Sequence, residues 1–173
     1  MKMIGEGNLV VEQTTVTDGT CRLATGTVVV GGEDGAREGY FEVALTADGE
    51  DDAMSGIMVG IVKTGLDHET SQYDTNNAWY LNAFSGSLCG NGNGKHSDHE
   101  QGKLKVGDRV GVLVDLDGGE GGDGGSVRFF VNGSEYGPGF KSGVVGPVVL
   151  GVELYDKYQK VTLLPDAEKP AGV

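Results

Sequence analysis

Hydrophobic and polar residues alternate along much of the chain, a pattern that is typical of β-strands with one buried face. In 39–45, the alternation places Phe41, Val43 and Leu45 on the same side of an extended segment. Apolar residues nowhere keep a helical spacing over several turns, so we expect no helix longer than about two turns. The segments that we expect to form strands are 8–13, 25–30, 39–45, 55–62, 78–84, 109–117, 126–131, 147–154 and 160–164.

The segments between these strands are rich in turn-forming residues. Examples are "GGEGGDGG" at 118–125 and "NGSEYGPG" at 132–139. Short strands separated by frequent turns predict an all-β fold, a sandwich of two antiparallel sheets. Alternation places one side of each strand in the core, and Trp79 is expected there as well. The other residues that we expect to be buried are Phe41, Ile57, Ile61, Val112, Val114, Phe129, Val148, Leu150, Val152 and Val161.

The length and the composition agree with this fold class. The chain has 173 residues, which suits one domain. It has 32 glycines and four prolines, and because the glycines follow no period, a collagen-like chain is excluded. We expect a single domain over residues 1–165 and a frayed C-terminal tail over residues 166–173.

The net charge of −13 narrows the classes of partner. Nucleic acids and anionic membranes bind proteins through Lys and Arg, and this chain has no basic cluster. The apolar runs are too short to cross a membrane, and the N-terminus lacks the apolar stretch of a signal peptide. Two cysteines in such a chain fit a reducing compartment. We therefore expect a cytoplasmic or nuclear protein that binds neither nucleic acid nor membranes.

A glycine-rich stretch at 87–96, "SLCGNGNGKH", suggests a phosphate-binding loop at first. That motif reads G-x-x-x-x-G-K-[ST] and opens a helix. Here Cys89 occupies the position of the first glycine, His96 occupies the hydroxyl position, and no helical pattern follows. The preferred interpretation is a connection between strands.

Two other groups of residues could hold a metal or perform catalysis. Asp115 and Asp117 match the first positions of a calcium loop, but the flanking segments are strands. Their spacing would also suit glycoside hydrolysis, although nothing apolar is evident that would raise the pKa of either carboxylate. His96 and His99 need a further ligand to bind zinc, and His68 lies in a different loop. We expect no metal, no cofactor and no enzymatic activity.

The order of the segments resembles a SPRY domain of the B30.2 type from about residue 38 to 165. The block at 106–140 carries most of the resemblance. The family pattern there is matched by Gly107-Asp108, Gly111, Asp115, Asp117, Phe129, Phe130, Asn132-Gly133 and Gly139-Phe140. The chain departs from the family before this block, because Ala78 replaces a serine and no glycine separates Trp79 from Tyr80. The glycine-rich loop at 118–125 is also longer than usual.

The resemblance implies a concanavalin-like sandwich of the jelly-roll type that binds proteins and is not catalytic. Such a domain would act as an adaptor, either as a monomer or as part of a larger protein. Its partner would be a peptide or a folded protein, held by loops at one end of the sandwich. The corresponding residues here are Asp34, Arg37, Tyr73, Asp74, Tyr80, Asn82, Glu153, Tyr155 and Tyr158. The alternative is a lectin-like sandwich that binds or hydrolyses glycans.

Overall fold

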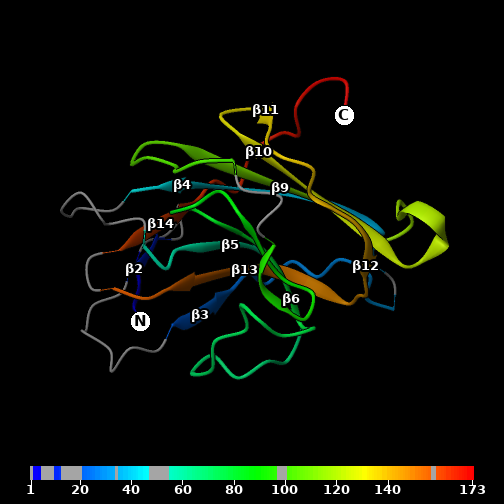
Figure 1. The fold of residues 1–173 in the computed structure, drawn as a ribbon, viewed down its shortest axis with the longest axis horizontal. Coiled ribbons are helices and arrows are strands. Elements are labelled where there is room, and N and C mark those ends of the chain that lie inside the picture. Colours follow the sequence, from blue (N-terminus) through cyan, green and yellow to red (C-terminus); the bar gives the residue numbers. More distant parts are fainter. Residues whose placement is uncertain are drawn as a thin grey trace.

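The computed structural model describes the backbone of residues 2–4, 10–12, 21–33, 35–46, 55–96, 101–156 and 159–173, and side chains from residue 21 onward. The described chain forms two antiparallel sheets that stack face to face (Figure 1). Within these ranges there is no α-helix, and one short 3-10 turn, Glu120–Gly122, interrupts the strands. The predicted all-β sandwich is therefore confirmed. No helix of the described residues is long and apolar enough to cross a membrane.

The larger sheet has eight strands, and its members β4, β9, β10 and β11 lie uppermost in Figure 1. Seven of them follow one another in space in the order β1-β2-β14-β4-β9-β10-β11, and β12 also pairs with β10. Their bounds are β1 Lys2–Ile4, β2 Val10–Glu12, β4 Glu38–Leu45, β9 Arg109–Asp115, β10 Gly125–Val131, β11 Ser134–Glu135, β12 Phe140–Val144 and β14 Lys160–Leu163. Strands far apart in the sequence are thus neighbours, as in the pairing of β14 with both β2 and β4.

The smaller sheet has six strands in the order β3-β13-β5-β6-β7-β8. Their bounds are β3 Arg22–Thr25, β5 Met58–Lys63, β6 Ala78–Asn82, β7 Leu88–Gly90, β8 Asn93–His96 and β13 Val148–Leu154. Strand β13 lies inside this sheet, with β3 on one side and β5 on the other. Both of its faces are covered, and all of its residues are buried.

The core lies between the facing sides of the two sheets. Phe129 of β10 is fully buried there and meets Phe140 edge to face, with 6.4 Å between the ring centroids. Trp79 is buried as predicted. Nine other residues that we expected in the core are also buried, namely Ile57, Ile61, Val112, Val114, Phe129, Val148, Leu150, Val152 and Val161. Phe41 is only partly buried and packs against the same core.

The glycine-rich stretch at 87–96 is a β-hairpin, so its interpretation as a connection between strands was wrong. Strands β7 and β8 pair with each other across it. Asn91 and Gly92 form the turn, with φ angles of 50° and 79°. Two consecutive positive φ angles define the tight turn that matches the twist of a hairpin, and Asn-Gly is the pair that adopts it most readily.

The strand predicted over 25–30 was also placed incorrectly. The regular strand is β3, which ends at Thr25, and the chain then leaves the ladder. It returns at Val30, which forms an isolated bridge with Val148. Val28 and Val29 in between are exposed. Three consecutive valines favour a strand in the sequence pattern. The pattern does not show whether their backbone pairs with a neighbouring strand or bulges away from it, which explains the error.

Candidate functional site

A long loop, residues 64–77, lies across the outer face of the smaller sheet. In Figure 1 it is the blue-green to green segment below that sheet, on the side away from the larger one. The outer face carries a second apolar cluster, and Leu66 of the loop packs against it. The cluster consists of Leu23, Met58, Val62, Ala78, Tyr80, Cys89 and Val149. Leu66 therefore helps to shield these side chains, which face away from the main core, from water.

Glu153 of β13 fixes the middle of the loop. Its side chain is fully buried. One carboxylate oxygen accepts a hydrogen bond from the Ser71 hydroxyl at 2.5 Å, and the other accepts one from the Gln72 backbone N–H at 2.6 Å. A buried carboxylate is tolerated when hydrogen bonds replace its lost water. Burial raises the pKa of Glu153, while these hydrogen bonds partly oppose the rise.

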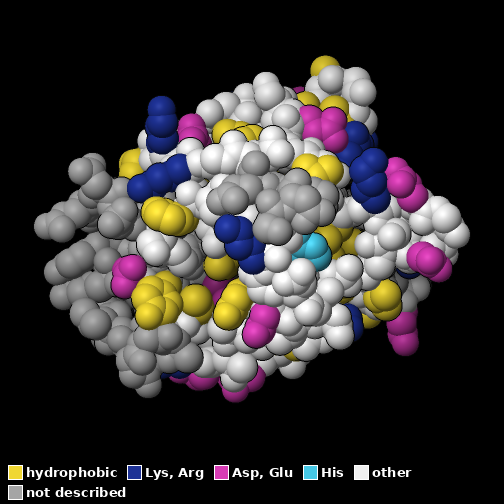
Figure 2. All heavy atoms as spheres, in the orientation of Figure 1, with side chains coloured by type: hydrophobic (Ala, Val, Ile, Leu, Met, Phe, Trp, Pro, Cys, Tyr) yellow, Lys and Arg dark blue, Asp and Glu magenta, His cyan; other side chains and the backbone are white. Residues whose placement is uncertain are grey.

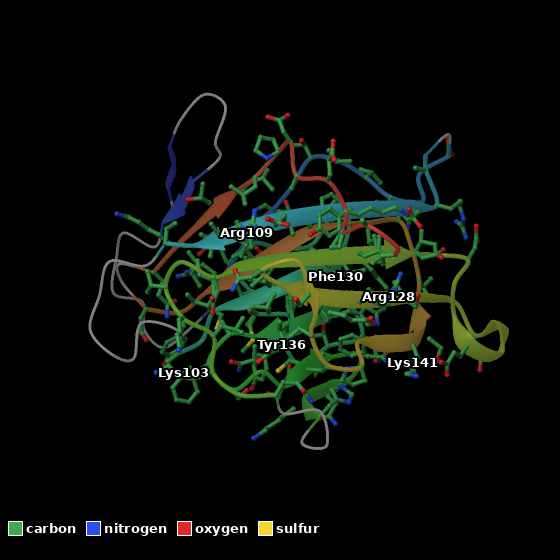
Figure 3. The ribbon with its side chains drawn as sticks, turned by 90° about the horizontal axis from the view of Figure 1, so that it is seen from above. Lys103, Arg109, Arg128, Phe130, Tyr136 and Lys141 are labelled. Carbon is green, nitrogen blue, oxygen red and sulfur yellow. The ribbon has the colours of Figure 1, made fainter. Side chains whose placement is uncertain are left out.

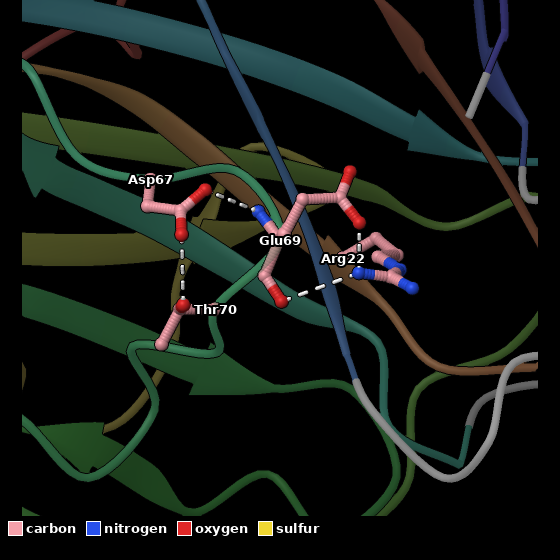
Figure 4. A network of polar contacts seen from close by, with 4 residues as sticks. All are labelled: Arg22, Asp67, Glu69 and Thr70. Carbon is pink, nitrogen blue, oxygen red and sulfur yellow. Dashed lines mark hydrogen bonds and ion pairs between the residues drawn. The ribbon is translucent and has the colours of Figure 1, made fainter.

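A second set of contacts ties the loop to the edge strand β3 (Figure 4). Arg22 forms an ion pair with the carboxylate of Glu69 and also donates to its backbone oxygen at 3.3 Å. Asp67 closes the turn by accepting hydrogen bonds from the Glu69 N–H at 3.0 Å and the Thr70 hydroxyl at 3.1 Å. These bonds lower the pKa of the Asp67 carboxyl. The Leu23 N–H adds a bond to the His68 carbonyl at 3.0 Å.

The loop presents Tyr73 and Asp74 to solvent. Tyr73 is 38% exposed, and its ring lies beside Gly94 of β8, since a side chain at Gly94 would approach its Cε2 to 2.9 Å. The neighbouring Gln72 is buried, and its side-chain oxygen accepts a hydrogen bond from Thr75 at 3.2 Å. The two exposed residues therefore stand on a loop whose backbone is held from below. We call the exposed side of this loop the 64–77 surface.

Two of the predicted contact residues lie underneath this surface. Tyr80 is on β6 and Glu153 is on β13, and both are fully buried. The expectation that they belong to exposed loops was wrong, because alternation along each strand turns them toward the outer face that the loop covers. Burial, followed by the charge of Glu153, raises the pKa of Tyr80. Its hydroxyl has no hydrogen-bond partner among the described residues.

The remaining predicted residues do not converge on the 64–77 surface. Arg37 forms an exposed ion pair with Asp117 at 2.8 Å rather than a contact with the loop. Asn82 ends β6, and its side-chain oxygen accepts the backbone N–H of Phe84 at 2.9 Å. Tyr155 is half-buried, and its side chain packs against Gly56. Asp34 and Tyr158 lie outside the described residues.

Cys21 is the side chain near Glu153 whose chemistry could suggest catalysis. Burial and the charge of Glu153 raise the pKa of its thiol to about 11. The thiolate is the reactive form of cysteine, and this environment disfavours it at neutral pH. Within the described ranges, no group of three or more His, Cys, Asp or Glu side chains could hold a metal ion. The arrangement is suited to holding a loop in place.

The outer face of the larger sheet is filled by its own side chains (Figure 3). Phe130 is 1% exposed, with Tyr40 packed edge to face at 6.2 Å and the Arg128 guanidinium 5.9 Å from its ring. Buried Glu42 accepts the Tyr40 hydroxyl at 2.7 Å and pairs with Arg109 at 3.3 Å. The pKa of Tyr40 is raised by burial and by Glu42.

The C-terminal segment, for which we expected a frayed tail, lies near this face. Lys169 pairs with Glu38 of β4 at 2.8 Å. A cavity of about 610 Å³ lies between residues 164–171 and the Glu42–Arg109 pair.

Figure 2 shows hydrophobic side chains in separate groups among charged ones, so that view alone does not indicate a site.

The sequence pattern did not single out the residues that hold the 64–77 surface in place, namely Arg22, Ser71 and Gln72. One signal was available. Glu153 is the single charged residue in "PVVLGVEL", and a carboxylate in an otherwise apolar strand requires hydrogen-bond donors from elsewhere. The sequence contained no indication of which loop would supply them.

Comparison with known proteins identifies the family. A model of the SPRY domain matches residues 38–164. No curated protein sequence matches the chain. The crystal structure of the SPRY domain of human HERC1 is similar with a TM-score of 0.65 and 16% identity, covering 90% of this chain and 94% of the other. A second crystal structure, of a human SPRY domain, has a TM-score of 0.67 and 18% identity and covers 96% of both chains. With the family model matching most of its length, the chain belongs to the SPRY domain family.

Proposed function

We propose that this SPRY domain binds a peptide or a folded protein through the 64–77 surface, with Tyr73 and Asp74 as contact residues. SPRY domains are generally protein-interaction modules without catalytic activity. The observation that carries the proposal is the fixation of the loop by Glu153, which leaves Tyr73 exposed on a backbone that is already ordered. A preordered tyrosine contributes contact area at little entropic cost, which favours binding.

The electrostatics of the surface indicate the kind of partner. Asp67, Glu69 and Asp74 all belong to the loop, and Arg22 neutralises only the carboxylate of Glu69. The chain as a whole carries −13. A partner segment with basic or polar side chains would complement this field. Glycan binding is the alternative; buried Trp79 could not stack on a sugar ring, so exposed Tyr73 would have to.

The test combines two substitutions on the loop. Tyr73→Ala with Asp74→Ala removes the exposed ring and the charge and leaves the bonds of Glu153 intact. We expect the free energy of unfolding to change by less than about 1 kcal/mol, as for most surface changes. Capture of the proteins that the wild-type domain retains from a lysate should fall at least tenfold, or about 1.4 kcal/mol.

Arg37→Ala is the control, because Arg37 is another exposed predicted contact and pairs with Asp117 rather than with the loop. It should leave capture unchanged. Loss of capture in Arg37→Ala, together with normal capture by the loop variant, would contradict the proposal. The roles predicted for Asn82 and Tyr155 stay predictions.

A further inference from the structure

An uncharged apolar surface lies at the end of the sandwich where β13 begins. Three segments contribute to it: 26–32 ("GTVVVGG"), 64–66 ("TGL") and 142–147 ("SGVVGP"). None of them contains a charged residue, although charged residues make up 23% of the chain. A lack of charge is what distinguishes the centre of a protein interface from ordinary surface. We call these segments the valine surface.

Backbone hydrogen bonds hold the three segments together. Val30 and Val148 bond to each other in both directions, at 2.9 and 3.0 Å. The Thr64 N–H donates to the Pro147 carbonyl at 3.2 Å. These bonds place the three segments next to one another at Val30, Pro147 and Thr64, at the end of the sandwich where β13 begins.

The side chains of this patch are exposed to an unusual degree. Val28 is 64% exposed, Val29 is 41% exposed and Val145 is 57% exposed. Pro147 is exposed beside them. Exposed aliphatic side chains that gather in one place indicate an interaction site more strongly than single ones do.

The backbone of the patch also has unused hydrogen-bonding capacity. Gly26 N–H bonds to Leu150 and Val30 bonds to Val148, so the chain bulges away from β13 between these contacts. The N–H and C=O groups of residues 27–29 make no hydrogen bond to any residue that the structure describes. An extended segment of another protein could cover the exposed valines with its side chains and form hydrogen bonds with the free backbone groups of residues 27–29.

We propose that the valine surface is a second docking site, which takes an extended, uncharged segment with small aliphatic side chains from a different protein. The adjacent ion pair, Arg37 with Asp117, is neutral overall. A second copy of this chain is disfavoured as the occupant because two chains of −13 repel each other. The valine surface shares residues 64–66 with the 64–77 loop, but its centre at Val148 and the Glu153 carboxylate that holds Ser71 and Gln72 are about 17 Å apart along β13 at ~3.3 Å per residue.

The experiment uses a defined probe, a short capped peptide of alternating valine and threonine. Backbone amide shifts of the isotope-labelled domain should change at Val28, Val29 and Val145 as the peptide is added. Val28→Asp with Val145→Asp should weaken binding at least tenfold, because the substitutions place charges in the apolar contact. The same peptide with methylated backbone nitrogens should also bind at least tenfold more weakly, because it cannot donate to the free carbonyls.

Two controls make the result decisive. Val106→Asp changes a valine that is 54% exposed elsewhere and should bind normally, as should Tyr73→Ala with Asp74→Ala. Normal binding by the loop variant would separate this site from the proposed function. The proposal is overturned if the peptide does not bind, if methylation has no effect, or if Val106→Asp weakens binding equally. It is also overturned if sedimentation shows a dimer of the wild-type chain that Val28→Asp with Val145→Asp abolishes.

Discussion

Glu153 shows how a single buried group can fix a distant part of the chain. It stands in a strand of aliphatic residues and glycine, and it is bonded to residues 81 and 82 positions away. Removing such a group would leave the Ser71 hydroxyl and the Gln72 N–H without their acceptor, which is costly for buried donors. The raised pKa of Glu153 makes this contact dependent on pH.

Glu153→Gln tests that dependence. The pKa of Glu153 in the folded state lies above its ordinary value of 4.5, so the folded state binds the proton more tightly than the unfolded state. Tighter proton binding stabilises the folded wild type. This stabilisation is fully present below pH 4.5 and is lost as the pH rises through the folded-state pKa of Glu153. The glutamine variant does not titrate. Relative to the wild type, its free energy of unfolding should therefore increase as the pH rises above 4.5. Denaturant unfolding across this range would measure it, and a constant difference would show that burial does not shift this pKa.

At the level of elements, two hairpins use the same turn chemistry. Asn91-Gly92 joins β7 to β8, and Asn132-Gly133 joins β10 to β11, where the asparagine and glycine φ angles are 52° and 81°. The two turns differ in their surroundings. A side chain at Gly92 would meet the Asn76 side chain at 2.6 Å, whereas the space around Gly133 is open.

Gly133→Ala and Gly92→Ala separate backbone strain from steric contact. Each places a side chain at a left-handed φ angle, which costs about 1–2 kcal/mol. Gly92→Ala must in addition displace Asn76, which belongs to the loop over the smaller sheet. Thermal or denaturant unfolding should show a larger loss for Gly92→Ala. Equal losses of stability in the two variants would mean that the Asn76 side chain moves aside at no measurable cost.

For the molecule as a whole, metal removal is the simplest test. No described group of side chains provides three ligands for a metal ion, and structural zinc or calcium sites need at least that number. Treatment with EDTA should leave the melting temperature unchanged. A fall that zinc or calcium reverses would point to a metal site completed by residues outside the described ranges.

The sequence predicted the sandwich because alternation is strong wherever a strand buries only one face. Segments 39–45 and 126–131 are examples, and both lie close to the observed β4 and β10. Strands β7 and β8 were missed because they are too short to show alternation. The 64–77 surface was predicted only as single residues, because the position of the loop depends on Glu153 and Arg22, which are distant in sequence.

The family match begins at residue 38, whereas β3 ends at Thr25 and completes one edge of the smaller sheet. A fragment cut at the family boundaries, residues 38–164, would therefore lack β3, and with it β1 and β2, of which β2 pairs with β14. The four register partners of β3 on β13, residues 151–154, would lose their neighbour, and Glu69 would lose Arg22. An uncovered strand edge invites association between chains. Recombinant work on this domain should therefore keep the residues before 38, since poor solubility of the shorter fragment would reflect the missing strands.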